Sequence, residues 1–444
     1  MGPIALSNRN LKLKTCLMLY FWVALLFSQP KNVLVNTDYQ SSFGTSEPSI
    51  AISRKNPEIM VIGTVLDGVY RSEDGGLTWE GKKLKSLYGV WGDPVLVADY
   101  RGDFHYFHLS DPTGRNWKSD EILDRIVIQS SSDGGQNWTP GSFTGFNPPK
   151  KQDKPWAVAH PSYHTLHLSW TQFDKYGSSD TADKSYILYS NSLDGGNTWS
   201  KPVQISLYPG DCIDSSATAE GAVPAVLSDS SVFIVWSRND SLWINASSDG
   251  GESWLPIEQF LFPHRGGWKI AVPGLQRANG MPFLVADALS AQFRDHLYLT
   301  WINWNTKKNR YQVMVSRSTN KGISWTKPAS VQDGGRQLAR FAVTACVDQS
   351  DGTVYLLYYQ QIDKRKPEYN VILKYSADGG KSWSKGIVIN EKKILVSDKI
   401  FFGDYIHIDA WKGVVRPVWT NYDGIQTNVY TAILHKNQIK TYKR

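Results

Sequence analysis

Cysteine is scarce in this sequence, with three residues in a chain of 444. Cys16 lies in an N-terminal apolar run, so only Cys212 and Cys346 remain in the body of the chain. Two cysteines that far apart make no disulfide framework and are too few for a cysteine metal site. The sequence leaves open whether Cys212 and Cys346 pair in an oxidising compartment.

Long apolar runs and basic stripes are also missing. After residue 28 no stretch reaches the length of a membrane span. The formal net charge of +7 is small for this length, and no stripe of Lys and Arg interleaves with aromatic residues. We therefore expect no nucleic-acid partner and no membrane span in the mature form.

The first residues have the pattern of an export signal. Arg9, Lys12 and Lys14 form a basic segment, and the apolar run Cys16–Phe27 that follows is too short to cross a bilayer. This pattern predicts a signal peptide over residues 1–28. The mature protein is then secreted, periplasmic or otherwise extracytoplasmic.

What the sequence has in abundance is a repeat of the form S-x-D-x-G-x-x-W. Five copies are complete: Ser72–Trp79, Ser131–Trp138, Ser192–Trp199, Ser247–Trp254 and Ser376–Trp383. A sixth copy, Ser318–Trp325, has Asn320 in place of the aspartate. The aspartate can bond to the amides of its own turn, and glycine supplies the positive φ that the turn needs. Such spacing predicts a repeat architecture.

These repeats are Asp boxes, and by them the chain resembles the sialidase-like, BNR-repeat superfamily. The resemblance implies an all-β propeller, with each box between the third and fourth strands of a blade, on the face away from the ligand. We therefore give the boxes a structural role and no catalytic one.

Alternating apolar positions predict three strands before each box. First strands are expected at Pro48–Ile52, Pro94–Ala98, Pro155–Ala159, Ala222–Leu227, Met281–Ala286, Phe341–Cys346 and Tyr405–Asp409. This count favours seven blades, with the six of the resembling sialidases as the alternative. The last unit lacks a box, and Asn32–Asn36 is expected to supply its fourth strand and to close the ring. No linker divides the chain, so residues 32–440 are expected to form one domain.

The innermost strands of a propeller begin at one mouth of the central channel, where a site is expected. The residues predicted there are Glu47, Asp93, Asp153 with Lys154, Glu220, Asn279, Arg340, and Asp404 with Tyr405. Crowded carboxyls shift one another's pKa values, as the acid and its partner in a glycosidase require. The same acids can hold Ca²⁺ or simply cap turns, and no other cofactor is expected.

Aromatic and basic residues near this mouth complete the predicted site. Trp91 and Trp156 stand beside the acids and are expected to serve as sugar platforms. Arg277, in the long loop 260–280, is a candidate contact for an anionic substrate, as are Lys154 and Arg340. The aromatic residues near the ends of the second strands are expected mostly to pack between blades: Trp170, Trp236, Trp301, Trp304, Tyr359 and Trp419.

Sialidases of this superfamily bind the substrate carboxylate with three arginines, and use an Asp as acid/base and a Tyr–Glu pair as nucleophile. Here the first inner strand reads TSEPSIAI and carries Glu47 where an arginine is expected. The three-arginine site is therefore not carried over. Tyr405, Asp404 and Glu220 remain compatible with a nucleophile or acid/base set, and Asp93 and Asp153 with general acids.

The leading interpretation is an exported glycoside hydrolase that acts on a glycan or glycoconjugate. A neutral glycan terminus is favoured over a sialylated one. The alternative is a non-catalytic carbohydrate-binding or scaffold propeller. A third interpretation is a true exo-sialidase, or a polysaccharide lyase that uses His160, Tyr163 and His164 near the third inner strand.

Overall fold

The computed structural model describes Gly2 and residues 29–36, 45–307, 310–333, 337–439 and 442. The predicted signal peptide over residues 1–28 thus lies outside the described residues, apart from Gly2. None of the helices in the described part of the chain combines the length and the apolar composition that a bilayer crossing needs.

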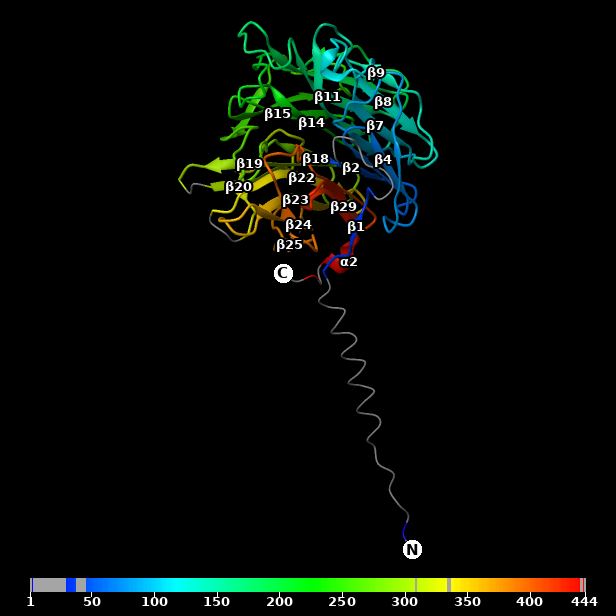
Figure 1. The fold of residues 1–444 in the computed structure, drawn as a ribbon, viewed down its shortest axis with the longest axis vertical. Coiled ribbons are helices and arrows are strands. Elements are labelled where there is room, and N and C mark those ends of the chain that lie inside the picture. Colours follow the sequence, from blue (N-terminus) through cyan, green and yellow to red (C-terminus); the bar gives the residue numbers. More distant parts are fainter. Residues whose placement is uncertain are drawn as a thin grey trace.

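The chain is built almost wholly from antiparallel strands arranged around a centre (Figure 1). The first sheet contains β2 (Ser49–Ile52), β3 (Met60–Thr64), β4 (Gly68–Ser72) and β5 (Glu80–Lys83). The second contains β6 (Val95–Ala98), β7 (Phe104–Leu109), β8 (Ile126–Ser131) and β9 (Ser142–Thr144). The third contains β10 (Lys151–Ala159), β11 (Leu166–Phe173), β12 (Ser185–Ser192) and β13 (Val203–Gln204).

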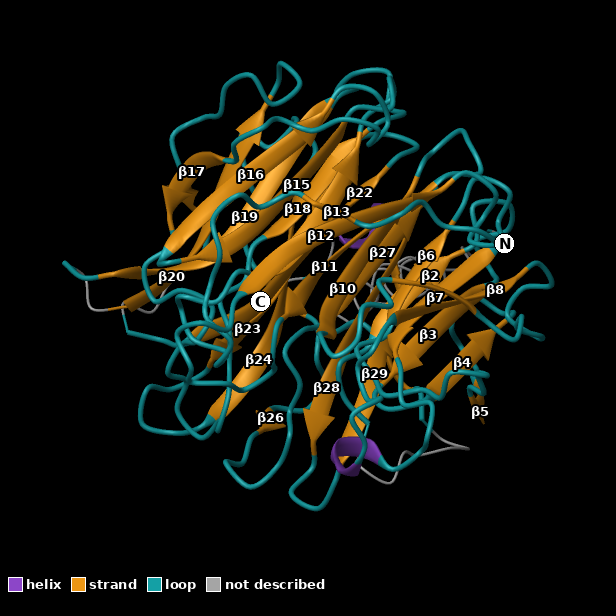
Figure 2. Cartoon of the chain, turned by 90° about the horizontal axis from the view of Figure 1, so that it is seen from above, coloured by secondary structure: helices purple, strands orange, loops and turns teal. Residues whose placement is uncertain are grey.

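The pattern continues through the second half of the chain. The fourth sheet contains β14 (Glu220–Val226), β15 (Val232–Arg238), β16 (Ser241–Ser247) and β17 (Gln259–Pro263). The fifth contains β18 (Phe283–Asp287), β19 (His296–Asn305), β20 (Arg310–Ser318) and β21 (Ala329–Ser330). The last sheet contains β22 (Arg340–Asp348), β23 (Thr353–Gln361), β24 (Glu368–Ser376), β25 (Ile387–Val388), β26 (Ile394–Leu395), β27 (His407–Trp411), β28 (Val414–Tyr422), β29 (Thr427–Ala432), β30 (Leu434–His435) and β1 (Asn32–Leu34). The described helices are short. They are the 3₁₀ turn Asn116–Lys118 and α2 (Lys436–Ile439), and α2 lies at the edge of the molecule (Figure 2).

The innermost strands form a closed ring. Each of β2, β6, β10, β14, β18, β22 and β27 packs against the next, and β27 packs against β2. Counted by innermost strands, the described ring has seven members; counted by hydrogen-bonded sheets it has six, because β26 joins β24 to β28. The all-β propeller predicted from the repeats is what the chain forms.

The N-terminal segment closes the ring as predicted. β1 pairs antiparallel with β29, with Asn32 opposite Ala432 and Leu34 opposite Tyr430. The amide of Val35 donates to the carbonyl of Val429 at 2.9 Å. Residues from the two ends of the chain therefore share one sheet, which covers an edge that would otherwise be free to pair with another chain.

The Asp boxes have the turn geometry that their residue types predict. In the third box, Ser192 Oγ accepts from the Gly196 amide at 2.7 Å, and Asp194 Oδ1 accepts from the Thr198 amide at 2.9 Å. Gly195 and Gly196 have φ values of 69° and 86°. In the sixth copy, Asn320 Oδ1 accepts from the Ser324 amide at 3.0 Å, so asparagine fills the place of the aspartate.

We expect Asp194→Ala to lower the free energy of unfolding by about 1–2 kcal/mol, because three local donors lose their acceptor. Thr198 donates to this carboxylate through both its amide and its hydroxyl, and Ser192 donates its hydroxyl. Chemical denaturation measures the change. Asp120→Ala, at an exposed loop position, is the matched control, and an equal change in both variants would contradict the structural role of the box.

Aromatic side chains fill the spaces between neighbouring sheets. Trp170, Trp236, Trp301 and Trp419 are each at most 1% exposed, which confirms the packing predicted for them. Trp170 also donates its indole N–H to Gln152 Oε1 at 2.7 Å. One core cluster joins β12 to β14 and β15, so burial ties each sheet to the next around the ring.

Both cysteines of the folded body are buried and free, Cys212 in the loop after β13 and Cys346 on β22. The question of their pairing, open in the sequence, is therefore answered: they form no disulfide.

Candidate functional site

Left-handed backbone residues lie just before β2 and β6 and inside β10. Glu47, Asp93 and Lys154 each precede a proline, and their φ values are 49°, 49° and 50°. Side chains other than glycine rarely adopt this conformation, and strain of this kind collects at functional sites. In β10 the pairing with β11 also shifts register between Asp153 and Trp156, and such a bulge re-aims the side chains beside it.

These turns bring the predicted acids together around one lysine. The Lys154 Nζ atom lies 3.0 Å from Asp404 Oδ2 and 3.5 Å from Asp93 Oδ2. Arg277 reaches the same carboxylate from its loop, with Nε 2.8 Å from Asp404 Oδ1 and a second contact from Nη2 to Oδ2. Asp404 is thus clamped between two cations that come from different parts of the chain. We call Glu47, Asp93, Asp153, Lys154, Glu220 and Asp404 the acidic cluster.

Several carboxyl oxygens of the acidic cluster have no hydrogen-bond partner in the described structure. They are Oε2 of Glu47 and both oxygens of Glu220. Glu47 Oε1 accepts from the Asp404 amide at 2.9 Å, while Glu220 is fully buried. Buried polar atoms are normally paired, so these oxygens are available to a proton, a water molecule or a ligand.

Burial and charge push the pKa values of these acids apart. Burial raises the pKa of Asp153 to about 7, although Lys154 opposes the shift. Burial, with the neighbouring Asp214, also raises the pKa of Glu220 well above its usual value, and that of Glu47 rises through burial with Asp93. Burial alone would raise the pKa of Asp404, but Arg277 and Lys154 lower it to about 2. A protonated acid and an ionised one therefore share the site at neutral pH.

Tyr405 packs at the base of the acidic cluster. Its hydroxyl donates to the carbonyl of Pro94 at 3.0 Å, and burial, together with Glu47 and Asp93, raises its pKa well above the usual value. Trp156 meets its ring edge-on at a centroid distance of 5.4 Å. The phenol is therefore neutral, and its proton points to a main-chain oxygen rather than to a carboxylate.

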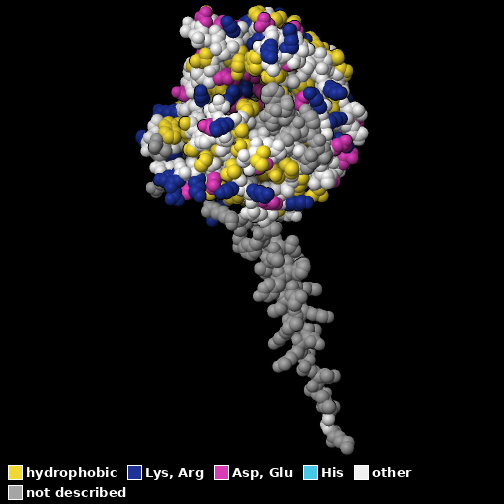
Figure 3. Space-filling view, in the orientation of Figure 1, with side chains coloured by type: hydrophobic (Ala, Val, Ile, Leu, Met, Phe, Trp, Pro, Cys, Tyr) yellow, Lys and Arg dark blue, Asp and Glu magenta, His cyan; other side chains and the backbone are white. Residues whose placement is uncertain are grey.

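The open side of the cluster is formed by loop residues that sequence reasoning did not single out. Asp214 accepts from the Tyr176 hydroxyl at 2.7 Å and lies 3.7 Å from Arg277 Nη1. Trp268 packs on the Arg277 guanidinium at 4.7 Å. A cavity of about 350 Å³ opens here, lined by Ile213, Asp214, Trp268, Lys269, Gln276, Arg277, Ile400, Phe401, Phe402 and Gly403. Basic and acidic side chains also lie side by side in a hollow near the centre of the face shown in Figure 3.

An aromatic ledge lies next to Asp214. Trp117 stacks on Tyr176 at a centroid distance of 5.4 Å and an interplanar angle of 23°, and it is 54% exposed. Trp91 meets Trp117 edge-on at 6.4 Å. An exposed indole held flat by a second ring suits stacking on a sugar face. Of the two predicted platforms, Trp91 belongs to this ledge, whereas Trp156 packs inside the channel against Phe283 and His407.

Arg340 is not part of the site, contrary to the placement expected from the sequence. Its guanidinium is buried between strands, where it donates to Gln360 Oε1 at 2.9 Å and to the carbonyl of Leu338 at 3.0 Å. The left-handed residue of this strand is Ala342, two positions later, with φ of 50°. The sixth innermost strand therefore brings no charged side chain to the acidic cluster, and Arg340 serves the packing of its sheet.

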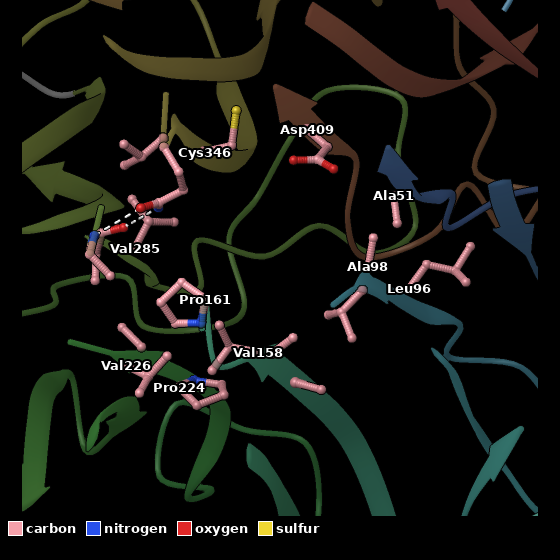
Figure 4. A pocket seen from close by; sticks show the side chains of 18 of the residues that line it. Ala51, Leu96, Ala98, Val158, Pro161, Pro224, Val226, Val285, Cys346 and Asp409 are labelled. Atoms are coloured by element: carbon pink, nitrogen blue, oxygen red, sulfur yellow. Dashed lines mark hydrogen bonds between the residues drawn. The ribbon is translucent and has the colours of Figure 1, made fainter. Parts of the chain in front are cut away.

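The far end of the channel has a different character. A cavity of about 300 Å³ lies there, and small apolar side chains from successive innermost strands point into it, among them Ala51, Ala98, Val158 and Val285 (Figure 4). Asp409 is the acid in its lining, and Arg54 pairs with it at 3.0 Å. His160 and Tyr163 follow β10 at this end, with ring centroids 4.5 Å apart, so the lyase interpretation places its groups away from the acidic cluster.

Comparison with known proteins supports the same architecture. The BNR repeat-like domain matches residues 269–431. A sialidase of Bacteroides fragilis is 22% identical over 325 residues, which are 71% of this chain and 48% of that protein. The chain has the sialidase-like BNR-repeat fold. It spans about half the length of that relative.

Solved structures with a similar arrangement include two arabinan-related proteins and one sialidase. The GH93 α-L-arabinofuranosidase of Fusarium graminearum has 14% identity and a TM-score of 0.47, with 75% of this chain and 93% of that chain covered. The α-L-arabinanase of Penicillium chrysogenum has 13% identity and a TM-score of 0.47, with 91% and 98% covered. The NanB sialidase of Streptococcus pneumoniae has 10% identity and a TM-score of 0.49, with 78% and 68% covered.

Proposed function

We propose that this sialidase-like propeller is an exported glycoside hydrolase whose active site is the acidic cluster. The observation that carries the proposal is that Lys154 interacts with two acids of opposite character: Asp153, with a pKa of about 7, and Asp404, with a pKa of about 2. Glycosidases need one carboxylic acid to protonate the leaving oxygen and one carboxylate that stays ionised. Burial and charge produce both states here without any other group.

In this proposal Asp153 is the general acid. Near neutral pH it holds a proton part of the time, which is the condition for efficient proton transfer to a glycosidic oxygen and back. Asp404 stays ionised because Arg277 and Lys154 clamp it, and with Asp93 it supplies negative charge near the sugar that becomes positive. The Trp117–Tyr176 ledge positions the ring of the sugar.

A neutral sugar fits this site better than a sialylated one. Among the described residues, Arg277 is the arginine that contacts the acidic cluster. Its Nε and Nη2 both donate to Asp404. A substrate carboxylate would meet the ionised Asp404, whose two cationic partners are already engaged with it. Repulsion between close carboxylates is worth on the order of 1–4 kcal/mol per pair. The proposed substrate is therefore a neutral glycan terminus.

A non-catalytic carbohydrate-binding propeller is the second candidate. The observation that favours it is burial: Glu47, Asp153, Glu220 and Asp404 are all less than 5% exposed. In that case the Trp117 ledge and the cavity beside Arg277 would bind a sugar, and the acids beneath would only shape the floor.

The test is to incubate the mature protein with neutral, sialylated and uronate-bearing glycans and to identify any products by mass spectrometry. Asp153→Asn runs in parallel, and Glu252→Gln, at an exposed position in the fourth Asp box, is the control. We expect hydrolysis of a neutral glycan by the wild type and by the control, but not by Asp153→Asn. Binding without any product would instead support the second candidate.

Replacing Trp117 by alanine is expected to raise the KM for that glycan by about tenfold, with a smaller change in kcat, because stacking holds substrate and transition state alike. Steady-state kinetics measures both constants. Trp117→Phe should recover most of the loss. Tyr163→Ala, another exposed aromatic at the far end of the channel, is the control, and an unchanged KM in Trp117→Ala would remove the ledge from the site.

A further inference from the structure

Two aspartates and two histidines meet at the end of the molecule opposite to the acidic cluster. Asp99 directly follows β6, Asp103 ends the turn after it, and His105 lies on β7. His164 comes from the turn between β10 and β11, in the next sheet. The Gly195 amide of the third Asp box donates to the His164 carbonyl at 2.9 Å, which places the group on the Asp-box face.

The donor atoms of this group converge. One oxygen of Asp99, one of Asp103 and one ring nitrogen of His164 lie within 4.8 Å of one another. Asp99 Oδ2 is 2.7 Å from His164 Nδ1 and 3.8 Å from His105 Nε2. Two ligand atoms on one tetrahedral zinc ion lie about 3.3 Å apart, and these two separations bracket that value.

His105 supplies an independent sign of a ligand. Its side chain is 1% exposed, and its Nε2 has no hydrogen-bond partner in the described structure although it faces Asp99. The other ring nitrogen is occupied, because Nδ1 lies 2.8 Å from Ser130 Oγ. A buried imidazole held at one nitrogen and unpaired at the other has the arrangement of a metal ligand with its supporting contact.

Asp99 is oriented in the same manner. Its Oδ1 accepts from the amides of Arg101 at 2.9 Å and Asp103 at 3.0 Å, so Oδ2 is turned toward the two histidines. The backbone amides therefore fix the direction in which this carboxylate presents its other oxygen.

We propose that Asp99, Asp103, His105 and His164 form a binding site for a divalent transition-metal ion of the zinc type. Mixed imidazole and carboxylate donors favour Zn²⁺ over Ca²⁺ and Mg²⁺, which take oxygen ligands. Two carboxylates match the charge of the ion. Three ligands come from the second sheet and one from the third, so the ion cross-links two neighbouring blades far from the proposed catalytic acids.

The experiment is isothermal titration of the chelator-treated full-length mature chain with ZnCl₂, with CaCl₂ as the comparison ion. We expect one Zn²⁺ per chain with micromolar or tighter affinity, no comparable binding of Ca²⁺, and a higher melting temperature with zinc, since an ion that binds only the folded state stabilises it. Co²⁺ in place of Zn²⁺ should give the strong visible absorption of a tetrahedral site.

Asp103→Asn and His164→Gln are each expected to weaken zinc binding at least tenfold and to abolish the zinc-dependent rise in melting temperature. His435→Gln, at a partly exposed histidine near α2, is the control and should bind like the wild type. The melting temperature of each metal-free variant shows whether it folds. Absence of zinc binding by the wild type, or binding that survives in folded His164→Gln and Asp103→Asn, would overturn the proposal.

Discussion

Replacing Asp153 by asparagine is expected to lower kcat on the cleaved glycan by about 10²- to 10⁴-fold, the usual contribution of a general acid. Asparagine keeps the shape of the side chain but cannot donate a carboxylic proton. KM should change much less, because the proton moves only in the transition state. Steady-state kinetics with the wild type and Glu252→Gln as references measures the effect. A loss below about threefold would exclude Asp153 as the acid.

The same variant is expected to remove a pH-dependent loss of stability. Burial raises the pKa of folded Asp153 from 3.8 to about 7, so stability is undiminished below about pH 4 and is lost as the pH rises from there through 7. Ionisation then costs up to about 4 kcal/mol, which asparagine cannot incur. Thermal unfolding between pH 4 and pH 9 should therefore show a steeper decline for the wild type than for Asp153→Asn. Parallel curves would contradict the raised pKa.

Lys154→Met is expected to lower the free energy of unfolding by about 3–5 kcal/mol at pH 8, the cost of leaving buried charges without their partner. Lys154 lies among Asp93, Asp153 and Asp404, and although burial alone would lower its pKa, these carboxylates raise it well above the usual value. Chemical denaturation at pH 8 and pH 5 measures the loss. It should be smaller at pH 5, where the acids with raised pKa values are already protonated.

Lys393→Met is the matched control for that measurement. Lys393 pairs with Glu368 at 2.6 Å, but its side chain is 55% exposed, and such a pair contributes about 0–1 kcal/mol. Equal losses in the two variants, or a loss below about 1 kcal/mol for Lys154→Met, would contradict the claim that Lys154 holds the acidic cluster together.

The sequence predicts the fold well because the Asp box is a local structure. Ser192, Asp194 and Gly196 form hydrogen bonds with one another inside an eight-residue motif, so each copy of the motif predicts its own turn. The closing strand at Asn32–Leu34 was also predictable, since one unit lacked a strand and one segment had no partner. The acids before the innermost strands were also predictable, because the regular spacing of the repeat indicates where each of these strands begins.

The rest of the site could not be predicted in this way. Asp214, Tyr176 and Trp117 lie in loops without strand pattern, and only the folded chain brings them beside Arg277. Arg340 was misplaced because a shift of register between Phe341 and Thr344 moves the turn by two residues, and alternation alone cannot show a bulge. The unpaired state of Cys212 and Cys346 likewise depends on distance in space rather than on spacing in the chain.

A carbon-13 NMR titration of the aspartate carboxyls tests the central claim, that a protonated acid and an ionised one share the acidic cluster at neutral pH. The protein is labelled at aspartate, and the resonance of Asp153 is assigned by its absence in Asp153→Asn. The account predicts a resonance that titrates with a midpoint near pH 7. A midpoint near the ordinary value of about 4 would contradict it and would leave the cluster without its general acid.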